Sequence, residues 1–469
     1  VTVEPQLHVD ASVRQLTGDH SLSSLPKTLQ NTTLFEAHGD LVDANRGMIE
    51  YNDLLKRPLD SYKYLLSTAE KSSVTLPTQI MYLDVVFFAS SNEIHLSAFK
   101  EYPDWASFKA RMELVRVPYL RCYQTEQAIY DEQVSSESMQ KPLAPHATMV
   151  AALWAVLTRL KKPNPERYPK TLRGLISSLS PLEKADLYSL GKTPAGMPLE
   201  KARGLRKALN DLYGESDSEA DYEGCTGASP REMKVTLLNA AQREDYKTLS
   251  PLAVLAEIQE LATQKNVYSF LNQEPKGQYR NHVELIDVVK NRWLDIADEE
   301  LHQAMGLVTS VQYDDLFKKY LTHVSHAGRG EKLYNEVTGK HEEPDSRFME
   351  ELETRFNIQK DAKAFRSEVL IRIGAAMRDG TQLENKDYRA LFPSIFKELE
   401  GSYYEEQREV ICKMAGTLLK FMTEEHAQLS TAEKRQAEQT MDALVHQFGY
   451  CKESAQETVS TLISERYSP

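Results

Sequence analysis

The stretch from Ala44 to Pro58, ANRGMIEYNDLLKRP, places acidic and amide side chains directly after a short apolar run. Its two acids are Glu50 and Asp53, and Asn52 precedes the second of them. In open α/β sheets, ligands bind at the carboxyl ends of the strands. A carboxylate there can sit near Mg²⁺ or orient the nucleophile during ATP hydrolysis. The stretch therefore fits a nucleotide hydrolase, although an ordinary strand, turn and helix with solvated acids would read the same way.

Three more residues, which lie further along the chain, occur in an order that suits the same chemistry. Asn92 comes after the apolar run 85–89, which we expect to be a buried parallel strand, and its carboxamide can hold the attacking water or touch the γ-phosphate. Arg111 precedes the alternating stretch 112–119, expected to be another strand, and can reach a neighbouring subunit's nucleotide. Arg231 lies in the first turn of a predicted helix, from which a lid domain could close it over the γ-phosphate.

The order of acid, asparagine, arginine and lid arginine resembles that of AAA+ ATPases, and the similarity to one family is closer. The stretches ANRGMIEYNDLLKRP, LLSTAEKSS, SSNE and ARMELVRVPY resemble successive blocks of the bacterial PrkA family, AAA+ proteins named as serine protein kinases. The similarity continues through LTRLKKP, LYNEVTGKHEEPDSRFMEELE, AKAFRSEVL and FGYCKESAQETVSTLISE. It is patchy but collinear over roughly residues 35–465.

This resemblance implies a role for each of these residues. Asp53 falls at the water-activating position and Glu50 at the family's own acid. Asn92 matches the asparagine of the second strand end, Arg111 the arginine that acts on a neighbouring subunit, and Arg231 the lid arginine. The implied catalytic residues are thus Asp53, Glu50, Asn92 and Arg111.

The chain also departs from the family pattern close to these positions. Asn52-Asp53 stands where AAA+ proteins have Asp-Glu, and the shorter acid reaches about 1.5 Å less far, one C–C bond. Ala110 replaces the aspartate before Arg111. We therefore expect a divergent site in which Asn52 and Arg231 contact ATP, Mg²⁺ accompanies the nucleotide, and no side chain is assigned as a metal ligand.

A phosphate loop of the form GxxxxGK[ST] is not found in the sequence. The stretch SLGKTPAGMP (189–198) contains Gly-Lys-Thr, but the earlier glycine is absent and Pro194 interrupts the helix that should follow, so we predict a loop. In the PrkA family the phosphate loop precedes the acid-bearing strand. We expect these residues to be the C-terminal part of a longer protein, or a protein whose first half is separate or lost, and to be inactive alone.

Signatures of other enzymes are missing or incomplete. A eukaryotic-type kinase needs HRDxxxxN followed by DFG. MRDGTQLEN (377–385) places its asparagine one residue too late and has no DFG after it, so we predict a coincidental loop. Kinase activity therefore rests on the resemblance alone.

Composition narrows the class of protein. The 469 residues are 41% hydrophobic and 27% charged, which fits two to four globular domains. A mean hydropathy of −0.50, with no apolar run of about 20 residues, predicts no membrane span. The net charge of −13 argues against nucleic acid as a partner. The four scattered cysteines suit reduced thiols in the cytoplasm.

We predict a fold of mixed α/β plus all-α class. It comprises a partial AAA+ α/β core over 1–137, a helical lid over 138–245 with a mobile acidic loop at 214–230, and a helical PrkA-type domain over 246–469. Helical periodicity is clearest in the stretches 146–163, 285–305, 403–422 and 430–449. The last opens with a capping box, Ser430 and Glu433, and stops at Gly449.

The leading functional hypothesis is a PrkA-like ATP-dependent serine/threonine protein kinase or remodelling ATPase. It would use Mg-ATP at the subunit interfaces of a homo-oligomer, act on protein clients and serve a stress response. Two alternatives stay open: a non-catalytic helical module that docks a client or regulator, and an ATP-dependent protease.

Overall fold

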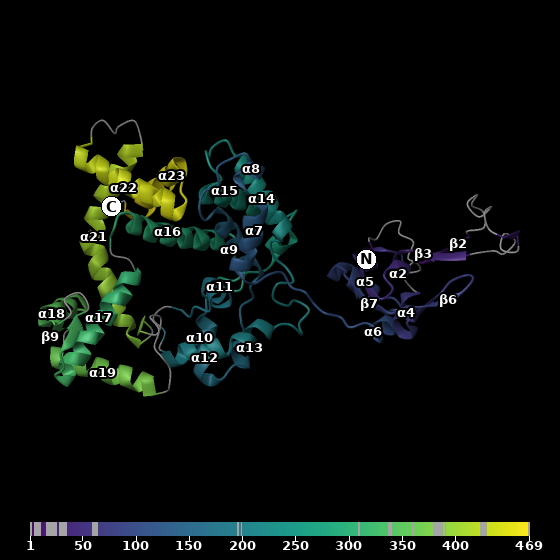
Figure 1. Ribbon diagram of the computed structural model, residues 1–469, viewed down its shortest axis with the longest axis horizontal. Helices are drawn as coiled ribbons and strands as arrows, with labels where there is room; N and C mark the ends of the chain where they lie inside the picture. Colours follow the sequence, from purple (N-terminus) through teal and green to yellow (C-terminus); the bar gives the residue numbers. More distant parts are fainter. Residues whose placement is uncertain are drawn as a thin grey trace. The chain divides into compact units, whose positions relative to one another are not determined.

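The computed structural model describes residues 2–3, 11–15, 26–27, 35–58, 64–194, 197, 199–307, 310–335, 340–358, 361–378, 388–389, 391–422 and 429–467. The chain divides into two compact units, Val1–Val117 and Pro118–Pro469 (Figure 1). We describe each unit by itself. The loop predicted at 377–385 lies outside the described residues from 379 onward.

The first unit contains a parallel β-sheet, which contributes to its hydrophobic core. Its three strands are β1 (Thr2–Val3), β4 (Gly47–Tyr51) and β7 (Val85–Ala89), in the order β1-β4-β7. Successive side chains of a strand point to opposite faces, so Ile49 and Tyr51 enter the hydrophobic core of this unit while their neighbours turn away. The expectation that 85–89 is a parallel strand is confirmed, but full burial is wrong, because Val86 and Phe88 are 54% and 51% exposed.

The other elements of the first unit are short. They are β2 (Ser12–Gln15) paired antiparallel with β3 (Phe35–His38), α2 (Asp40–Asp43), η2 (Leu54–Lys56), α4 (Leu65–Lys71), β5 (Ser73–Thr75) paired antiparallel with β6 (Ile80–Tyr82), α5 (Glu93–Phe99) and α6 (Trp105–Lys109). The strand expected at 112–119 is wrong. Within the described residues no strand pairs with this stretch, and Val115 and Val117 are exposed.

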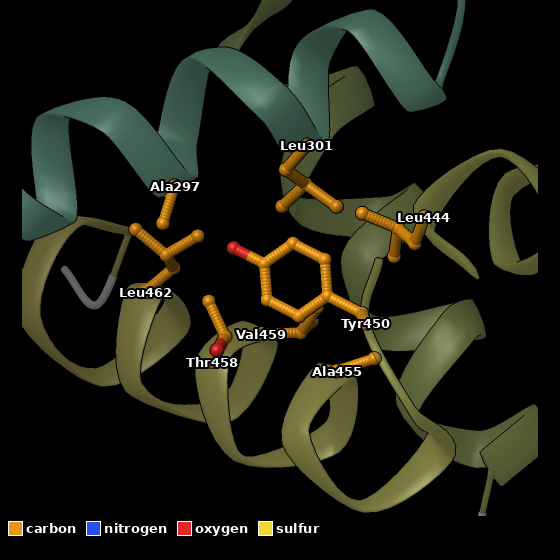
Figure 2. Close-up of a pocket in the computed structure, with 8 residues that line it drawn as sticks. All are labelled: Ala297, Leu301, Leu444, Tyr450, Ala455, Thr458, Val459 and Leu462. Atoms are coloured by element: carbon orange, nitrogen blue, oxygen red, sulfur yellow. The ribbon is translucent and has the colours of Figure 1, made fainter. Parts of the chain in front are cut away.

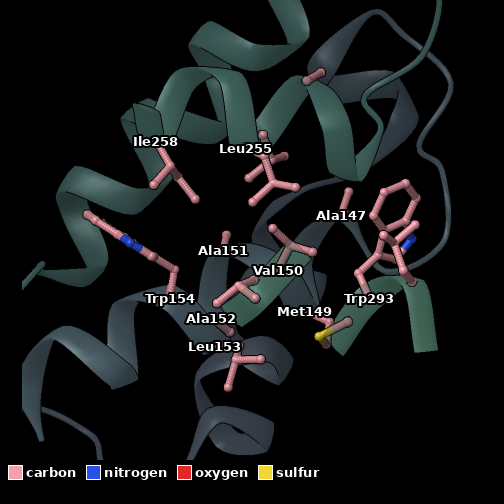
Figure 3. Packing of buried hydrophobic residues seen from close by; sticks show 14 of the residues in the cluster. Ala147, Met149, Val150, Ala151, Ala152, Leu153, Trp154, Leu255, Ile258 and Trp293 are labelled. Carbon is pink, nitrogen blue, oxygen red and sulfur yellow. The ribbon is translucent and has the colours of Figure 1, made fainter. Parts of the chain in front are cut away.

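The second unit is built around α9 (Ala147–Arg159), in which every residue is buried. Helices α7 (Tyr123–Gln133), α14 (Pro230–Gln242), α15 (Pro251–Thr263) and α16 (Glu284–Ala304) pack against it. A helix that is apolar on all sides must be covered on all sides. Leu255 and Ile258 of α15 and Trp293 of α16 belong to the same core as α9 (Figure 3).

The remaining elements of this unit are also mainly helical. They are α8 (Ser136–Met139), η3 (Pro165–Arg167), α10 (Lys170–Ser178), α11 (Pro181–Leu190), α12 (Leu199–Lys207), α13 (Leu209–Gly214), η4 (Ser269–Asn272), α17 (Ser310–Arg329), β8 (Leu333–Asn335), β9 (Lys340–Glu342), α18 (Ser346–Arg355), α19 (Ala362–Arg378), α21 (Pro393–Met422), α22 (Thr431–Phe448), α23 (Lys452–Leu462) and a π-helical turn, η6 (Ile463–Tyr467). None of the described helices is both long and apolar enough to cross a membrane.

The four stretches with the clearest periodicity are helical, as α9, α16, α21 and α22. At α22 the predicted capping box is present, and Gly449 ends the helix with a φ of 75°. Helical spacing in the sequence of α21 also predicts a buried face made of Val410, Ile411, Met414, Leu418 and Met422, and this prediction needs correction. Val410 is 46% exposed and Met414 is half-buried, whereas Ile411, Leu418 and Met422 are buried as expected, and Ala415 is buried beside them.

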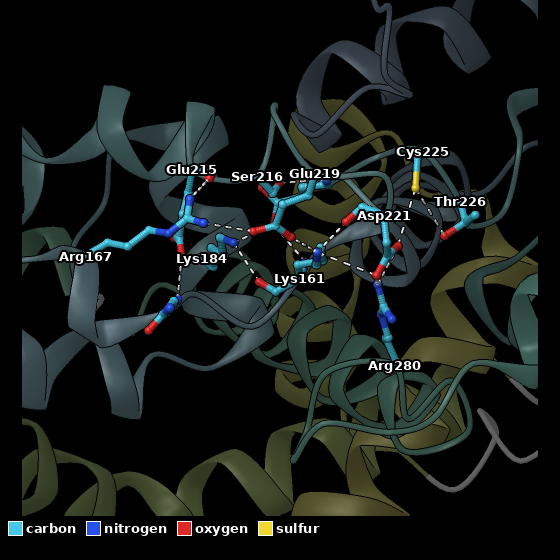
Figure 4. A network of polar contacts seen from close by, with 12 residues as sticks. Lys161, Arg167, Lys184, Glu215, Ser216, Glu219, Asp221, Cys225, Thr226 and Arg280 are labelled. Atoms are coloured by element: carbon cyan, nitrogen blue, oxygen red, sulfur yellow. Dashed lines mark hydrogen bonds and ion pairs between the residues drawn. The ribbon is translucent and has the colours of Figure 1, made fainter. Parts of the chain in front are cut away.

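The acidic segment 214–230 is packed against the rest of its unit, so the expected mobility is wrong. Glu223 is 2% exposed and forms ion pairs with Arg121 and Lys184. Nearby, Lys161 bonds Glu219 at 2.7 Å (Figure 4). A buried charge is costly unless it is paired, so these contacts fix the course of the segment.

A small cavity lies among α16, α22 and α23 of the second unit. Its lining includes Leu301, Leu444, Tyr450 and Val459 (Figure 2), and its volume is about 10 Å³. Such a space holds roughly one water molecule. It offers no room for a nucleotide or a peptide.

Candidate functional site

The predicted acids lie where β4 ends. The strand stops at Tyr51, and Asn52-Asp53 forms a turn into η2. Asp53 has a φ of 49°, in the left-handed region that aspartate and asparagine visit more readily than most side chains. This conformation turns the chain away from the sheet directly after the strand. The acid is therefore placed at the carboxyl end of β4, as the sequence predicts.

Ser90 joins the ends of the two neighbouring strands. Its N–H donates to the Tyr51 carbonyl at 2.9 Å, and its carbonyl accepts from the Leu54 N–H at 2.9 Å. The Ser90 hydroxyl accepts from the Asp53 N–H at 3.1 Å and donates to the Asn52 side-chain oxygen at 3.0 Å. Ser90 was not predicted from the sequence. The available signal was a small polar residue immediately after the second apolar strand.

The Asp53 carboxylate is paired with Lys56, one turn further along η2. The Lys56 ammonium lies 2.6 Å from Oδ2, and the two side chains are 42% and 27% exposed. Ion pairs in contact with solvent are worth about 0–1 kcal/mol. Mg²⁺ or a phosphate could therefore replace either partner at little cost. Lys56 was also missed, although its i+3 spacing from an acid was visible in DLLK.

Glu50 and Asn92 flank this turn from the two strands. Glu50 lies on the sheet face opposite Ile49 and Tyr51, in register with Phe88 of β7, and is exposed. Asn92 is the exposed N-cap of α5, and its carbonyl accepts from the Leu96 N–H at 3.0 Å. The structure thus brings the ends of β4 and β7 together by direct pairing, with four of the six predicted side chains on or just beyond them.

Arg111 follows α6 in the same unit and is held by another carboxylate. Its Nε and Nη2 atoms donate to Glu70 Oε2 at 2.8 and 2.6 Å, and its Nη1 donates to the Ser107 carbonyl at 2.9 Å. The Glu70 side chain is 53% exposed. The pair is open to solvent, so an arginine that acts on another subunit would first exchange Glu70 for a phosphate. Glu70 was not predicted from the sequence, and it lies 41 residues from Arg111.

Arg231 belongs to the second unit, where it is the exposed second residue of α14. Ser229 caps this helix, Pro230 occupies its first turn, and Glu232 completes a capping box. The helix start expected from the sequence is therefore confirmed. Contact between Arg231 and ATP stays a prediction.

The site also has groups suited to a magnesium nucleotide. In the part of the chain that the structure describes, no three His, Cys, Asp or Glu side chains cluster as a metal site. Mg²⁺ is usually held by one or two carboxylates together with substrate phosphates and water, so a cluster is not required. The Asp53 carboxylate and the Asn52 amide oxygen are ligands of the right kind.

The Gly-Lys-Thr sequence at 191–193 is a loop, as predicted. Gly191 ends α11 with a φ of 64° and is therefore preceded by a helix. A phosphate loop joins a strand to the start of a helix. Residues 191–193 consequently supply no phosphate cradle.

Comparison with known proteins agrees with this architecture. A family model described as the PrkA AAA domain matches residues 1–167, and one described as the PrkA serine protein kinase C-terminal domain matches residues 182–460. The second match alone covers more than half of the chain. The chain belongs to the PrkA family. It therefore has an N-terminal AAA domain followed by a helical C-terminal domain, which confirms the predicted fold class.

Two relatives with similar sequences are named for different activities. ATP-dependent protease PrkA of Bacillus subtilis (strain 168) is 26% identical over 403 residues, which are 85% of this chain and 59% of the relative. Serine/threonine kinase YeaG of Escherichia coli (strain K12) is 21% identical over 348 residues, 72% of this chain and 49% of the relative. The chain thus spans less than two thirds of either relative. No solved structure gave a significant match.

Proposed function

We propose that this chain is part of an ATP-dependent serine/threonine protein kinase or remodelling ATPase of the PrkA family. The observation that supports the proposal is the pairing of β4 with β7, which places Asn52, Asp53 and Asn92 at the carboxyl ends of these strands. Open α/β sheets bind their ligands at this edge. Asp53 would orient the nucleophile, Glu50 would assist it, and Asn52 would contact the nucleotide. Mg²⁺ would neutralise the transferring phosphoryl group.

Oligomer formation belongs to the same proposal. Arg111 would leave Glu70 and reach the nucleotide of a neighbouring subunit, while Arg231 would approach the γ-phosphate from α14. A guanidinium supplied to a transferring phosphoryl group stabilises its charge. We place the assembly in the cytoplasm, with proteins as its clients and a role in the stress response.

A protease is the second candidate, because the Bacillus subtilis relative is named as one. A serine–lysine protease needs a neutral lysine beside its nucleophile. Lys184 is the buried lysine of the described residues, and its ammonium donates to Glu223 and to the Lys161 carbonyl. The hydrogen bonds of this lysine go to a carboxylate and a main-chain carbonyl, and none goes to a serine hydroxyl of the described residues, which favours the kinase or ATPase over the protease.

Casein separates these activities when it is incubated with the complete gene product and Mg-ATP carrying a γ-phosphate label. We expect label on casein serine or threonine, intact casein chains, and loss of labelling when EDTA removes Mg²⁺. Casein fragments without label would show a protease and contradict the proposal.

A non-catalytic interaction module is the remaining alternative, because these 469 residues contain no phosphate-loop motif. Titration calorimetry of Mg-ATP into the 469-residue chain and into the complete gene product tests it. We expect micromolar binding by the complete product only. The kinase and ATPase proposal fails if the complete product also fails to bind nucleotide.

A further inference from the structure

We propose that Thr158 and Arg159, together with Glu126, are positioning residues that set the direction of Arg231. This inference rests on the proposed function, in which Arg231 approaches ATP. It assigns a purpose to a buried ion pair that the phosphoryl chemistry itself does not use.

Arg159 is completely buried at the C-terminal end of α9, and each of its five N–H groups has an acceptor. Nε and Nη2 donate to the Ala228 carbonyl at 2.9 and 2.7 Å. Nη1 and Nη2 donate to the two carboxylate oxygens of Glu126 at 2.9 and 2.7 Å. Nη1 also donates to the Leu120 carbonyl at 2.9 Å. The guanidinium therefore has one orientation.

The neighbouring residue of α9 holds the other side of Ala228. The Ala228 N–H donates to the Thr158 hydroxyl at 2.9 Å, and this hydroxyl donates in turn to the Ala155 carbonyl at 2.6 Å. The preceding Gly227 has a φ of 134°, and a Cβ there would lie 2.5 Å from Arg159 Cγ. The backbone just before α14 is thus fixed at both its N–H and its C=O groups.

Only Ser229 and Pro230 separate this fixed residue from Arg231. Ser229 is the N-cap, and its hydroxyl accepts from the Glu232 N–H. Pro230 has a restricted φ because of its ring. Little backbone freedom remains, so the first turn of α14 starts in a direction that α9 determines. Because Arg231 is exposed, its reach depends on the backbone that carries it.

A purely stabilising role explains the Arg159–Glu126 pair less well. Buried ion pairs are often no more stabilising than apolar residues of the same volume. Arg159 of this pair, however, donates to the main-chain carbonyl of Ala228, three residues before the predicted lid arginine. The geometry suits orientation of α14 as well as stability. A substitution changes ATP kinetics through Arg231 only if the pair orients α14.

Thr158→Val tests the inference in the complete gene product, because it removes the acceptor of the Ala228 N–H and leaves the buried charges in place. We expect KM for ATP to rise, or kcat to fall, by at least about fivefold. Thr158→Ser keeps the hydroxyl and should restore the wild-type values. Thr236→Val is the matched control, because Thr236 is also buried, but its hydroxyl donates to the Glu232 carbonyl within α14 at 2.9 Å.

Combination with Arg231→Ala separates positioning from stability. If Thr158 acts through Arg231, Thr158→Val changes the ATP kinetics less than about twofold in the Arg231→Ala background, while it lowers thermal stability equally in both backgrounds. An equal kinetic effect in both backgrounds would overturn the positioning role alone. If Arg231→Ala leaves ATP kinetics unchanged, the lid role of Arg231 fails, and positioning fails with it.

A second probe covers the case in which Thr158→Val does not fold. Gly227→Ala places a methyl group 2.5 Å from Arg159 Cγ and 3.0 Å from the Thr158 hydroxyl oxygen, so it displaces the side chains that hold Ala228 without removing either of them. We expect the effect of Gly227→Ala on ATP kinetics to be reduced in the Arg231→Ala background, as for Thr158→Val. A folded Gly227→Ala protein with wild-type ATP kinetics would contradict it.

Discussion

Asp53 contributes to the proposed site through its backbone as well as through its carboxylate. Its N–H binds Ser90 at the end of the neighbouring strand, and its left-handed φ turns the chain at the sheet edge. The sequence could predict an acid at a strand end, because apolar runs and the polar residues after them are local patterns. It could not predict Ser90 or Glu70 as partners, because those contacts join residues 37 and 41 positions apart.

Arg111 gives a prediction at the level of a single side chain. If it stabilises phosphoryl transfer, Arg111→Ala should lower kcat for ATP by roughly 10³-fold or more, since its guanidinium faces transition-state charge. Glu70→Gln removes the competing carboxylate, and it should change kcat less than about fivefold because the pair is exposed. Steady-state ATP turnover of the complete gene product measures both variants.

The control for Arg111→Ala is Lys109→Ala, since Lys109 is an exposed cation at the end of α6, two residues before Arg111. It should leave turnover unchanged. If Arg111→Ala behaves like Lys109→Ala, the arginine serves only to bind Glu70 and has no part in the chemistry.

Helices were the elements most accessible to prediction, because their periodicity and caps lie within one stretch of sequence. Strands were harder. The stretch 112–119 alternates as a strand does, yet no described strand lies beside it to complete a ladder. The acidic segment 214–230 was misjudged for a related reason. Its charge count is local, whereas Arg121 and Lys184, which pair with Glu223, are distant in sequence.

His282 links two elements of the helical unit and predicts a pH dependence. Its Nε2 atom contacts the Phe270 carbonyl of η4 at 2.9 Å, and its own carbonyl accepts from Trp154 of α9. Burial lowers the pKa of His282 below its ordinary value of 6.5. Below about pH 6.5 the unfolded chain therefore binds a proton that the folded chain refuses. Its contribution to stability is complete above that pH and is lost as the pH falls.

His282→Gln should remove this contribution, because an amide can still donate to the Phe270 carbonyl and does not titrate. Urea unfolding followed by fluorescence of the buried Trp154 and Trp293, at several values between about pH 5 and 8, measures it. The wild-type unfolding free energy should fall more steeply with decreasing pH than that of the variant. Equal slopes would contradict the assignment, and the exposed His446→Gln serves as the control.

At the scale of the whole molecule, the sequence correctly predicted an α/β part followed by a helical part within one family. The proposed boundaries at 137 and 245 stay predictions. The structure divides the chain after Val117, and the two family models cover 1–167 and 182–460. Composition and periodicity identify the class of each part, but a boundary depends on which contacts cross it, and those are not local in sequence.

ATP turnover by the complete gene product tests most directly whether ATP is processed at the joined ends of β4 and β7, as proposed. Asp53→Asn and Glu50→Gln keep the size of each side chain and remove its charge. Asp43→Asn, at an exposed acid of α2 in the same unit, is the control. We predict that Asp53→Asn lowers kcat by roughly 10²-fold or more, that Glu50→Gln lowers it as well, and that the control does not. Wild-type turnover by both Asp53→Asn and Glu50→Gln would contradict the account.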